Sequence, residues 1–159
     1  MMRTIRQATE ADLPAVLDLY ADAGFDYGVR LEMEKAQEIF RRFATYPSYR
    51  LFVAVDPDGK VAGTYALLFM DNIAHIGKPL AIVEQVAVAA SNQGTGLGTL
   101  MMRHAMDQSR AHGCYKMALS SNVKFDAAHR FYEGLGFTRH GYSFVVHLEP
   151  NPGLDIIND

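Results

Sequence analysis

Residues 83–100 read VEQVAVAASNQGTGLGTL, a strand end followed within a few residues by a glycine-rich turn and the start of an amphipathic helix. Gly94, Gly96 and Gly98 let the backbone approach a ligand closely. The first N–H groups of a helix have no partner inside it, so they favour the oxygens of a phosphate or pyrophosphate. The segment predicts a phosphate-binding turn, although glycines at this spacing also occur for turn formation and packing alone.

Two well-known phosphate-binding motifs fit this turn poorly. A dinucleotide-binding unit carries its glycines after the first strand and an acidic residue about 20 positions later. Here the turn lies late in the chain, and the next expected strand, Cys114–Ser120, ends without Asp or Glu. A P-loop is excluded because no Gly-Lys-Ser/Thr follows the glycines. Another class of phosphate-binding turn is therefore indicated.

Working outward from the turn, hydrophobic periodicity predicts an α/β fold in the order β-α-α-β-β-β-α-β-α-β. We expect one domain over residues 1–150, followed by a polar C-terminal tail over residues 151–159. The first expected helix begins after Thr9, which is its N-cap. Three further helices are expected over about residues 31–44, 98–112 and 126–133. The expected strands are Thr4–Ala8, Leu51–Val55, Val61–Met70, Leu80–Val88, Cys114–Ser120 and Tyr142–Leu148.

Composition excludes several classes of protein. The 159 residues carry a net charge of −3, which argues against a general binder of nucleic acid. One cysteine cannot form an internal disulfide, no apolar run reaches the ~18 residues of a membrane span, and the histidines lack metal-ligand spacing. We expect a cytoplasmic protein that binds no nucleic acid, no membrane and no metal.

Two motifs resemble the GNAT superfamily of N-acetyltransferases. Gln93-x-x-Gly96-x-Gly98, preceded by the strand end Val86-Ala87-Val88, is similar to that family's Gln/Arg-x-x-Gly-x-Gly/Ala signature. About 36 residues later, His129–Phe137 (HRFYEGLGF) resembles its second hallmark, a tyrosine followed by a Leu-Gly-Phe turn. The resemblance spans about Thr4–Leu148 and implies the GNAT fold, a central mixed, mostly antiparallel sheet with helices on both faces.

The resemblance implies direct transfer of an acetyl group from acetyl-CoA to the primary amine of a small molecule. Such amines are protonated at neutral pH, so a base must release the free amine, and a thiolate must be protonated as it leaves. Glu84 is the candidate base, acting through water from the strand face that carries Val86 and Val88. Tyr132 stands at the family's general-acid position. The alternatives are an ion-paired Glu84 and a core Tyr132.

The resemblance also implies which residues hold acetyl-CoA. Backbone groups around Val86–Val88 would bind the pantetheine arm, and Gln93 with the following amides would bind the pyrophosphate. Since Gln93 lacks the charge of the commoner Arg, the amides would carry more of that role. The expected co-substrate residues are Val86, Ala87, Val88, Gln93, Gly94, Thr95, Gly96, Leu97, Gly98, Thr99 and Asn122.

The acceptor is left open. Glu84–Val88 and Gly113–Met117 resemble glucosamine-6-phosphate N-acetyltransferases, whereas Ser121–Lys124 and Ala128–Tyr132 resemble aminoalkylphosphonate N-acetyltransferases. We expect the acceptor site to lie between the first helices, the loop Asp71–Pro79 and the C-terminal hairpin. A protein or peptide N-acetyltransferase and a non-catalytic acetyl-CoA-binding protein are the alternatives, and a homodimer is usual for the family.

Overall fold

The computed structural model describes residues 2–148, which form two compact units, one ending at Leu119 and one beginning at Ser120. Each unit is described by itself. The tail expected over residues 151–159 lies outside the described residues, and the single domain over residues 1–150 stays a prediction.

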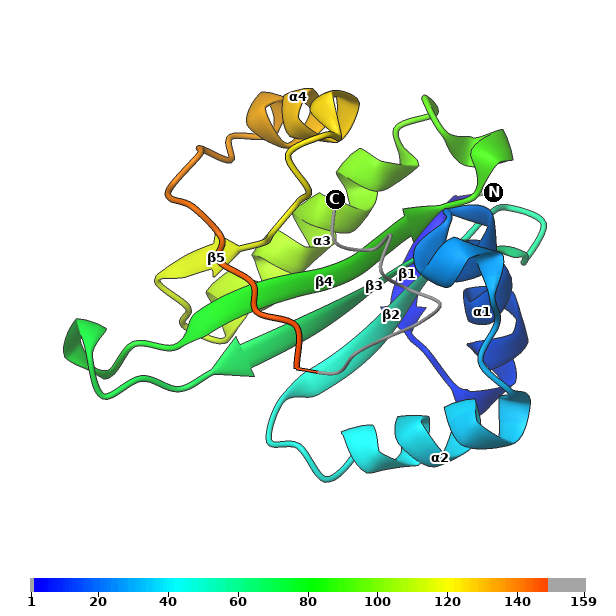
Figure 1. Cartoon of the computed structure of the whole chain (residues 1–159), viewed down its shortest axis with the longest axis horizontal. Helices are drawn as coiled ribbons and strands as arrows, with labels where there is room; N and C mark the ends of the chain where they lie inside the picture. Colours follow the sequence, from blue (N-terminus) through cyan, green and yellow to red (C-terminus); the bar gives the residue numbers. More distant parts are fainter. Residues whose placement is uncertain (1, 149–159) are drawn as a thin grey trace. The chain divides into compact units, whose positions relative to one another are not determined.

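The first unit is built on a five-stranded sheet in the order β1-β2-β3-β4-β5 (Figure 1). Neighbouring strands from β1 to β4 run antiparallel, and β5 runs parallel to β4. The predicted mixed, mostly antiparallel sheet is therefore confirmed. The strands are β1 (Thr4–Gln7), β2 (Tyr49–Val55), β3 (Val61–Met70), β4 (Leu80–Val88) and β5 (Lys116–Ala118).

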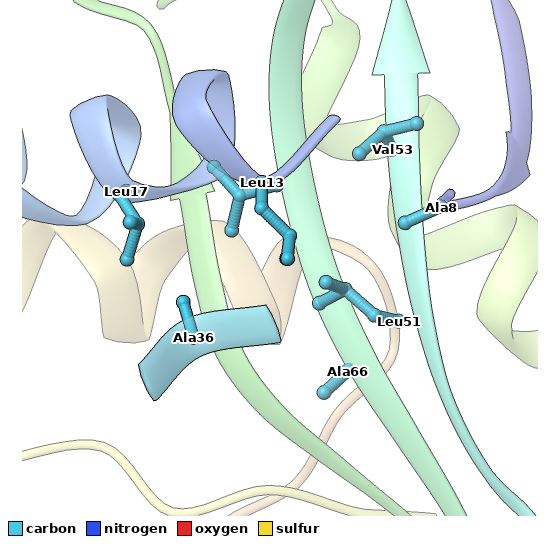
Figure 2. Packing of buried hydrophobic residues seen from close by; sticks show 8 residues of the cluster. Ala8, Leu13, Leu17, Ala36, Leu51, Val53 and Ala66 are labelled. Carbon is cyan, nitrogen blue, oxygen red and sulfur yellow. The ribbon is translucent and has the colours of Figure 1, made fainter. Parts of the chain in front are cut away.

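Two helices, α1 (Leu13–Asp22) and α2 (Met33–Phe43), cover one face of the sheet. Two local features favour the start of α1. Thr9 and Asp12 form a capping box just before the helix, and a proline lies in its first turn. Figure 2 shows side chains of both helices meeting those of the strands in one apolar cluster. The labelled members are Ala8, Leu13, Leu17, Ala36, Leu51, Val53 and Ala66.

The third helix, α3 (Leu97–Ala111), covers the other face. A Cβ added at Gly63 would lie 2.6 Å from Met101 Sδ, so β3 and α3 approach closely there. The Tyr65 hydroxyl oxygen lies 2.6 Å from His104 Nδ1 on α3. Odd-numbered residues of β3 therefore face α3, and even-numbered ones face α1 and α2 because side chains alternate along a strand.

Short 3-10 turns connect several of these elements: η1 (Glu10–Asp12), η2 (Phe25–Gly28), η3 (His75–Gly77) and η4 (Ala90–Asn92). Within residues 2–148, no helix is long and apolar enough to cross a membrane.

The second unit contains the helix α4 (Asp126–Gly134), as predicted. The strand predicted over Tyr142–Leu148 is wrong, because this segment has no strand structure and its large apolar side chains are exposed. Alternation and β-branched residues show that a segment is able to form a strand. The strand exists only where its backbone groups bond to a neighbouring strand, and the described part of the second unit, residues 120–148, contains no strand that could pair with it.

Candidate functional site

The glycine-rich turn leads from the end of β4 into α3 and has the geometry of an anion-binding turn. Gly94 and Gly96 have φ of +72° and +86°, a left-handed conformation that glycine adopts without steric cost. Gly96 is the N-cap of α3, and no side chain caps the helix. The predicted turn and helix start are confirmed.

Several N–H donors of this turn have no protein acceptor in the part of the chain that the structure describes. They belong to Gly94, Gly96, Leu97, Gly98 and Thr99. The aligned peptides of α3, a helix of 15 residues, add a partial positive charge at the same end. Free N–H donors together with a positive helix end favour phosphate oxygens.

The polar side chains of the turn are engaged with the backbone around them. Gln93 Nε2 donates to the Val88 carbonyl oxygen over 3.4 Å, so this side chain is turned back toward the end of β4. Thr95 Oγ1 donates to the Asn92 carbonyl oxygen over 2.5 Å. Arg3 Nη1 donates to the Thr95 carbonyl oxygen over 2.7 Å, although the two residues are 92 positions apart. Sequence reasoning missed Arg3, because no local pattern links it to the turn.

A β-bulge interrupts β4 just before the turn. Glu84 lies opposite Ala66 on β3, whereas Ala87 lies opposite Thr64. Gln85 and Val86 therefore share a single opposing residue, Tyr65. Gln85 has φ of +55°, as a bulge residue forced out of the extended conformation has.

The bulge overturns the predicted alternation of Glu84 and Val88. Glu84 is paired with Ala66, which faces α1 and α2, and Val88 is paired with Gly63, which faces α3. The two side chains therefore point to opposite faces of the sheet. The prediction that Glu84, Val86 and Val88 share one face is wrong, since an extra residue in one strand shifts the alternation by one.

Within the first unit, the outer edge of β4 has no partner strand beside the bulge. β5 pairs with β4 only at Leu80–Ile82, so Val83–Val88 have no strand on that side within residues 2–148. Unpaired backbone groups on a strand edge can hydrogen-bond an extended ligand. Within the first unit, no other strand therefore pairs with the outer edge at Val86, Ala87 and Val88.

The Glu84 side chain is exposed and makes no ion pair with any residue from 2 to 148. The ion-paired alternative is therefore not seen in this part of the chain. Tyr49, paired with Leu68, lies on the same face of the sheet as Glu84. Burial, with a contribution from the negative charge of Glu84, raises the pKa of Tyr49. This face thus combines an accessible carboxylate with a phenol that stays neutral.

Tyr132 lies on α4 in the second unit. Its ring centroid is 5.3 Å from that of Phe131 and 5.5 Å from that of Phe137. Burial raises the pKa of Tyr132, so the phenol is neutral at physiological pH and carries the proton that a general acid donates. The aromatic contacts equally suit a packing role.

Asn122 shapes the turn that leads into α4. Its Oδ1 accepts a hydrogen bond from the Lys124 N–H over 3.0 Å, and its carbonyl oxygen accepts one from the Phe125 N–H over 3.1 Å. His129 Nε2 lies 2.8 Å from the same carbonyl oxygen. Contact between Asn122 and a co-substrate stays a prediction. Among residues 2–148, no three His, Cys, Asp or Glu side chains form a metal-binding group.

Comparison with known proteins matches the chain to one family. The model described as "Acetyltransferase (GNAT) family" matches residues 9–137. A glucosamine 6-phosphate N-acetyltransferase from Trypanosoma brucei brucei is 34% identical over 84 residues, which are 53% of this chain and 55% of that protein. A streptothricin acetyltransferase from Streptomyces lavendulae is 35% identical over 99 residues, 62% of this chain and 49% of that protein. The chain thus spans about half the length of these relatives.

A solved structure extends the likeness to almost the whole chain. A putative acetyltransferase from Agrobacterium tumefaciens str. C58 superposes with a TM-score of 0.84 at 30% identity. The superposition covers 91% of this chain and 99% of that one.

Proposed function

The chain belongs to the acetyltransferase (GNAT) family, and we propose that it transfers the acetyl group of acetyl-CoA to the primary amine of a small molecule. The observation that carries the proposal is the turn before α3, with two left-handed glycines and a set of free N–H donors. The two curated relatives reported above are named for small acceptors, glucosamine 6-phosphate and streptothricin. Acetyl-CoA supplies the reactive thioester.

Acetyl-CoA would be held at two places in the first unit. The free amides of Gly94, Gly96, Leu97, Gly98 and Thr99, with Gln93 beside them, would bind the pyrophosphate, whereas the Thr95 N–H donates to the Asn92 carbonyl oxygen. The open edge of β4 at Val86–Val88 would bind the amide-containing pantetheine arm, and its N–H groups would polarise the thioester carbonyl. Asn122 is a further proposed contact.

The reaction needs one side chain that accepts a proton and one that donates a proton. Glu84, through a water molecule, removes the proton that keeps the acceptor amine charged, and the neutral nitrogen then attacks the thioester carbon. The carbon–sulfur bond then breaks, Tyr132 donates its phenolic proton to the departing thiolate, and the phenolate takes up the extra proton of the new amide nitrogen. Since Glu84 faces α1 and α2, the acceptor amine would approach from that side of the sheet, in agreement with the acceptor position expected near the first helices.

The test is release of the CoA thiol from acetyl-CoA in the presence of different amines. The panel contains amino-sugar phosphates, aminoalkylphosphonates, polyamines, aminoglycosides and peptides with a free N-terminus, with a reaction lacking acceptor as control. Release with one small-molecule class supports the proposal and identifies the acceptor chemistry. Release with peptides alone would replace it by peptide acetylation, and acetyl-CoA binding without any transfer would indicate a non-catalytic binding protein.

Three expectations, on the location, the oligomeric state and the partners of the protein, stay predictions. They are a cytoplasmic location, in keeping with the single unpaired Cys114, a possible homodimer, and the lack of a nucleic-acid or membrane partner.

A further inference from the structure

The first residues of the chain reach the phosphate-binding turn. Arg3 directly precedes β1, and its guanidinium donates to the Thr95 carbonyl oxygen over 2.7 Å. In Figure 1 the start of β1 lies beside the turn that precedes α3, as this hydrogen bond requires. The guanidinium has five N–H donors, and within residues 2–148 it pairs with no carboxylate. Its positive charge is thus not neutralised by this part of the protein.

The turn itself carries no cationic side chain. Residues 89–99 (AASNQGTGLGT) contain neither Lys nor Arg. Gln93, where the family signature also admits Arg, is neutral, and its amide nitrogen donates to the Val88 carbonyl oxygen. A ligand with several phosphate charges would therefore meet only backbone dipoles from the turn, and Arg3 adds the formal charge that the turn lacks.

The contact also fixes the orientation of one peptide group. In a trans peptide the C=O and N–H groups point in opposite directions, so Arg3 on the Thr95 carbonyl holds the Gly96 N–H pointing away from it. That N–H is one of the free donors of the turn. A charged donor on the carbonyl polarises the peptide and makes its N–H a stronger donor.

We propose that Arg3 is a positioning residue for the phosphates of acetyl-CoA, acting through the Thr95–Gly96 peptide and through its own positive charge. The proposal rests on the proposed function, because it needs a phosphate-bearing co-substrate at this turn. The effect belongs to binding: KM for acetyl-CoA and Kd for CoA depend on Arg3, whereas kcat does not.

The experiment compares the wild type with Arg3→Gln, Arg3→Lys and the control Arg110→Gln. Gln retains an N–H donor for the Thr95 carbonyl but no charge, and Lys retains the charge. Arg110 is an exposed arginine in the last turn of α3, roughly 20 Å along the helix from the turn. Calorimetric titration with CoA at low and high salt, and initial rates with acetyl-CoA and with acetyl-pantetheine, are the measurements.

We expect Arg3→Gln to raise Kd for CoA and KM for acetyl-CoA about tenfold, with kcat within about twofold. Arg3→Lys should recover most of the affinity, and Arg110→Gln should match the wild type. Salt should weaken CoA binding more steeply in the wild type than in Arg3→Gln. With acetyl-pantetheine, which has no pyrophosphate, Arg3→Gln and the wild type should have equal KM.

Several results would overturn this inference. Three outcomes would each show that the charge of Arg3 does not contribute to phosphate binding. They are an unchanged Kd for CoA in Arg3→Gln, an equal rise in KM with acetyl-pantetheine, and no recovery of affinity in Arg3→Lys. If Arg3→Gln folds poorly, Arg3→Met, which keeps an unbranched side chain without the charge, replaces it in the same titrations. If the wild type itself does not bind CoA, the proposed function falls as well; if it binds CoA and Arg3→Gln binds equally well, only the role of Arg3 falls.

Discussion

Tyr132 carries the clearest single-residue prediction. Burial against Phe131 and Phe137 raises the pKa of its phenol and keeps it protonated, so replacing it with Phe removes the proton but leaves the ring. For Tyr132→Phe we expect kcat to fall at least about tenfold, with little change in KM for acetyl-CoA. Initial rates with a responsive acceptor are the measurement, and Tyr142→Phe, at a phenol 92% exposed, is the control. Unchanged turnover would leave Tyr132 with a packing role only.

Glu84 carries a prediction on pH. If its carboxylate takes the proton of the acceptor, Glu84→Gln should lose activity most strongly near neutral pH. The loss should shrink as the pH rises toward the pKa of the amine, near ~10, because free amine then accumulates without a base. Glu34→Gln, at an exposed acidic residue of α2, is the control for the loss of one negative charge. An equal loss at every pH would contradict the role as base.

Asp12 carries a prediction on stability. Its carboxylate accepts two hydrogen bonds from Arg6, at 2.7 and 2.9 Å, and one from the Thr9 N–H. The Arg6 hydrogen bonds, against an opposing effect of burial and with help from Thr9, lower the pKa of Asp12 from 3.8 to about 2. The pKa of Asp12 is lower in the folded protein than in the unfolded chain, so the ionised carboxylate stabilises the fold fully at pH values above the ordinary pKa of 3.8. This contribution is lost as the pH falls through the folded pKa of about 2.

For Asp12→Asn we therefore expect a loss of about 1–2 kcal/mol in the free energy of unfolding at neutral pH. The difference from the wild type should shrink as the pH falls from about 4 toward about 2, the interval between the ordinary and folded pKa. Urea unfolding across this pH range measures it. A difference that does not change with pH would mean that the carboxylate charge contributes nothing.

At the scale of an element, the two ends of α3 provide a matched pair of glycines. Gly96 precedes the helix with φ of +86°, Gly113 follows it with φ of +81°, and an added Cβ would meet nothing within 4 Å at either position. Replacement by Ala should therefore cost about 1–2 kcal/mol of stability at each site through the backbone conformation alone. Only Gly96→Ala should also weaken CoA binding, since only Gly96 belongs to the turn. Thermal unfolding and CoA titration of both variants test this, and equal CoA affinity would contradict the assignment of the turn.

The strand β4 shows where prediction at this scale fails. Its boundaries, Leu80–Val88, were predictable from its run of apolar and β-branched residues. Its bulge was not predictable. Gln85 adopts φ of +55°, and a positive φ is common for Gly, Asn and Asp but not for Gln. The pairing with β3 imposes the bulge, and with it the face on which Glu84 lies.

At the scale of the whole molecule, acetyl-CoA should stabilise the folded protein. A ligand that binds only the native state at one hundred times its Kd adds about 2.7 kcal/mol to the free energy of unfolding. For a chain of 159 residues this corresponds to a rise in the unfolding midpoint of roughly 5–10 °C. Thermal shift with acetyl-CoA measures it, with acetyl-pantetheine as the control that should give a smaller rise. No shift at saturating acetyl-CoA would contradict binding to the native fold.

Most elements and the family were predictable from the sequence because their signals are local. The capping box at Thr9 and the glycines before α3 each act over a few residues. The strand expected at Tyr142–Leu148 failed because its pattern is also local, while a strand needs a partner from elsewhere in the chain. The contact between Arg3 and the turn could not have been predicted, because no sequence pattern near Arg3 indicates that its side chain reaches Thr95.

The amino-acid sequence by itself determined the chemistry available to this protein: a glycine-rich turn before a helix, an acidic residue on the preceding strand and a tyrosine before a Leu-Gly-Phe turn. Only the tertiary structure decided which face of the sheet receives Glu84, and which cation reaches the turn. The physical reason is that periodicity and turn propensity describe neighbours along the chain. Register, bulges and contacts over 92 residues depend on the packing of strands and helices that are distant in the sequence.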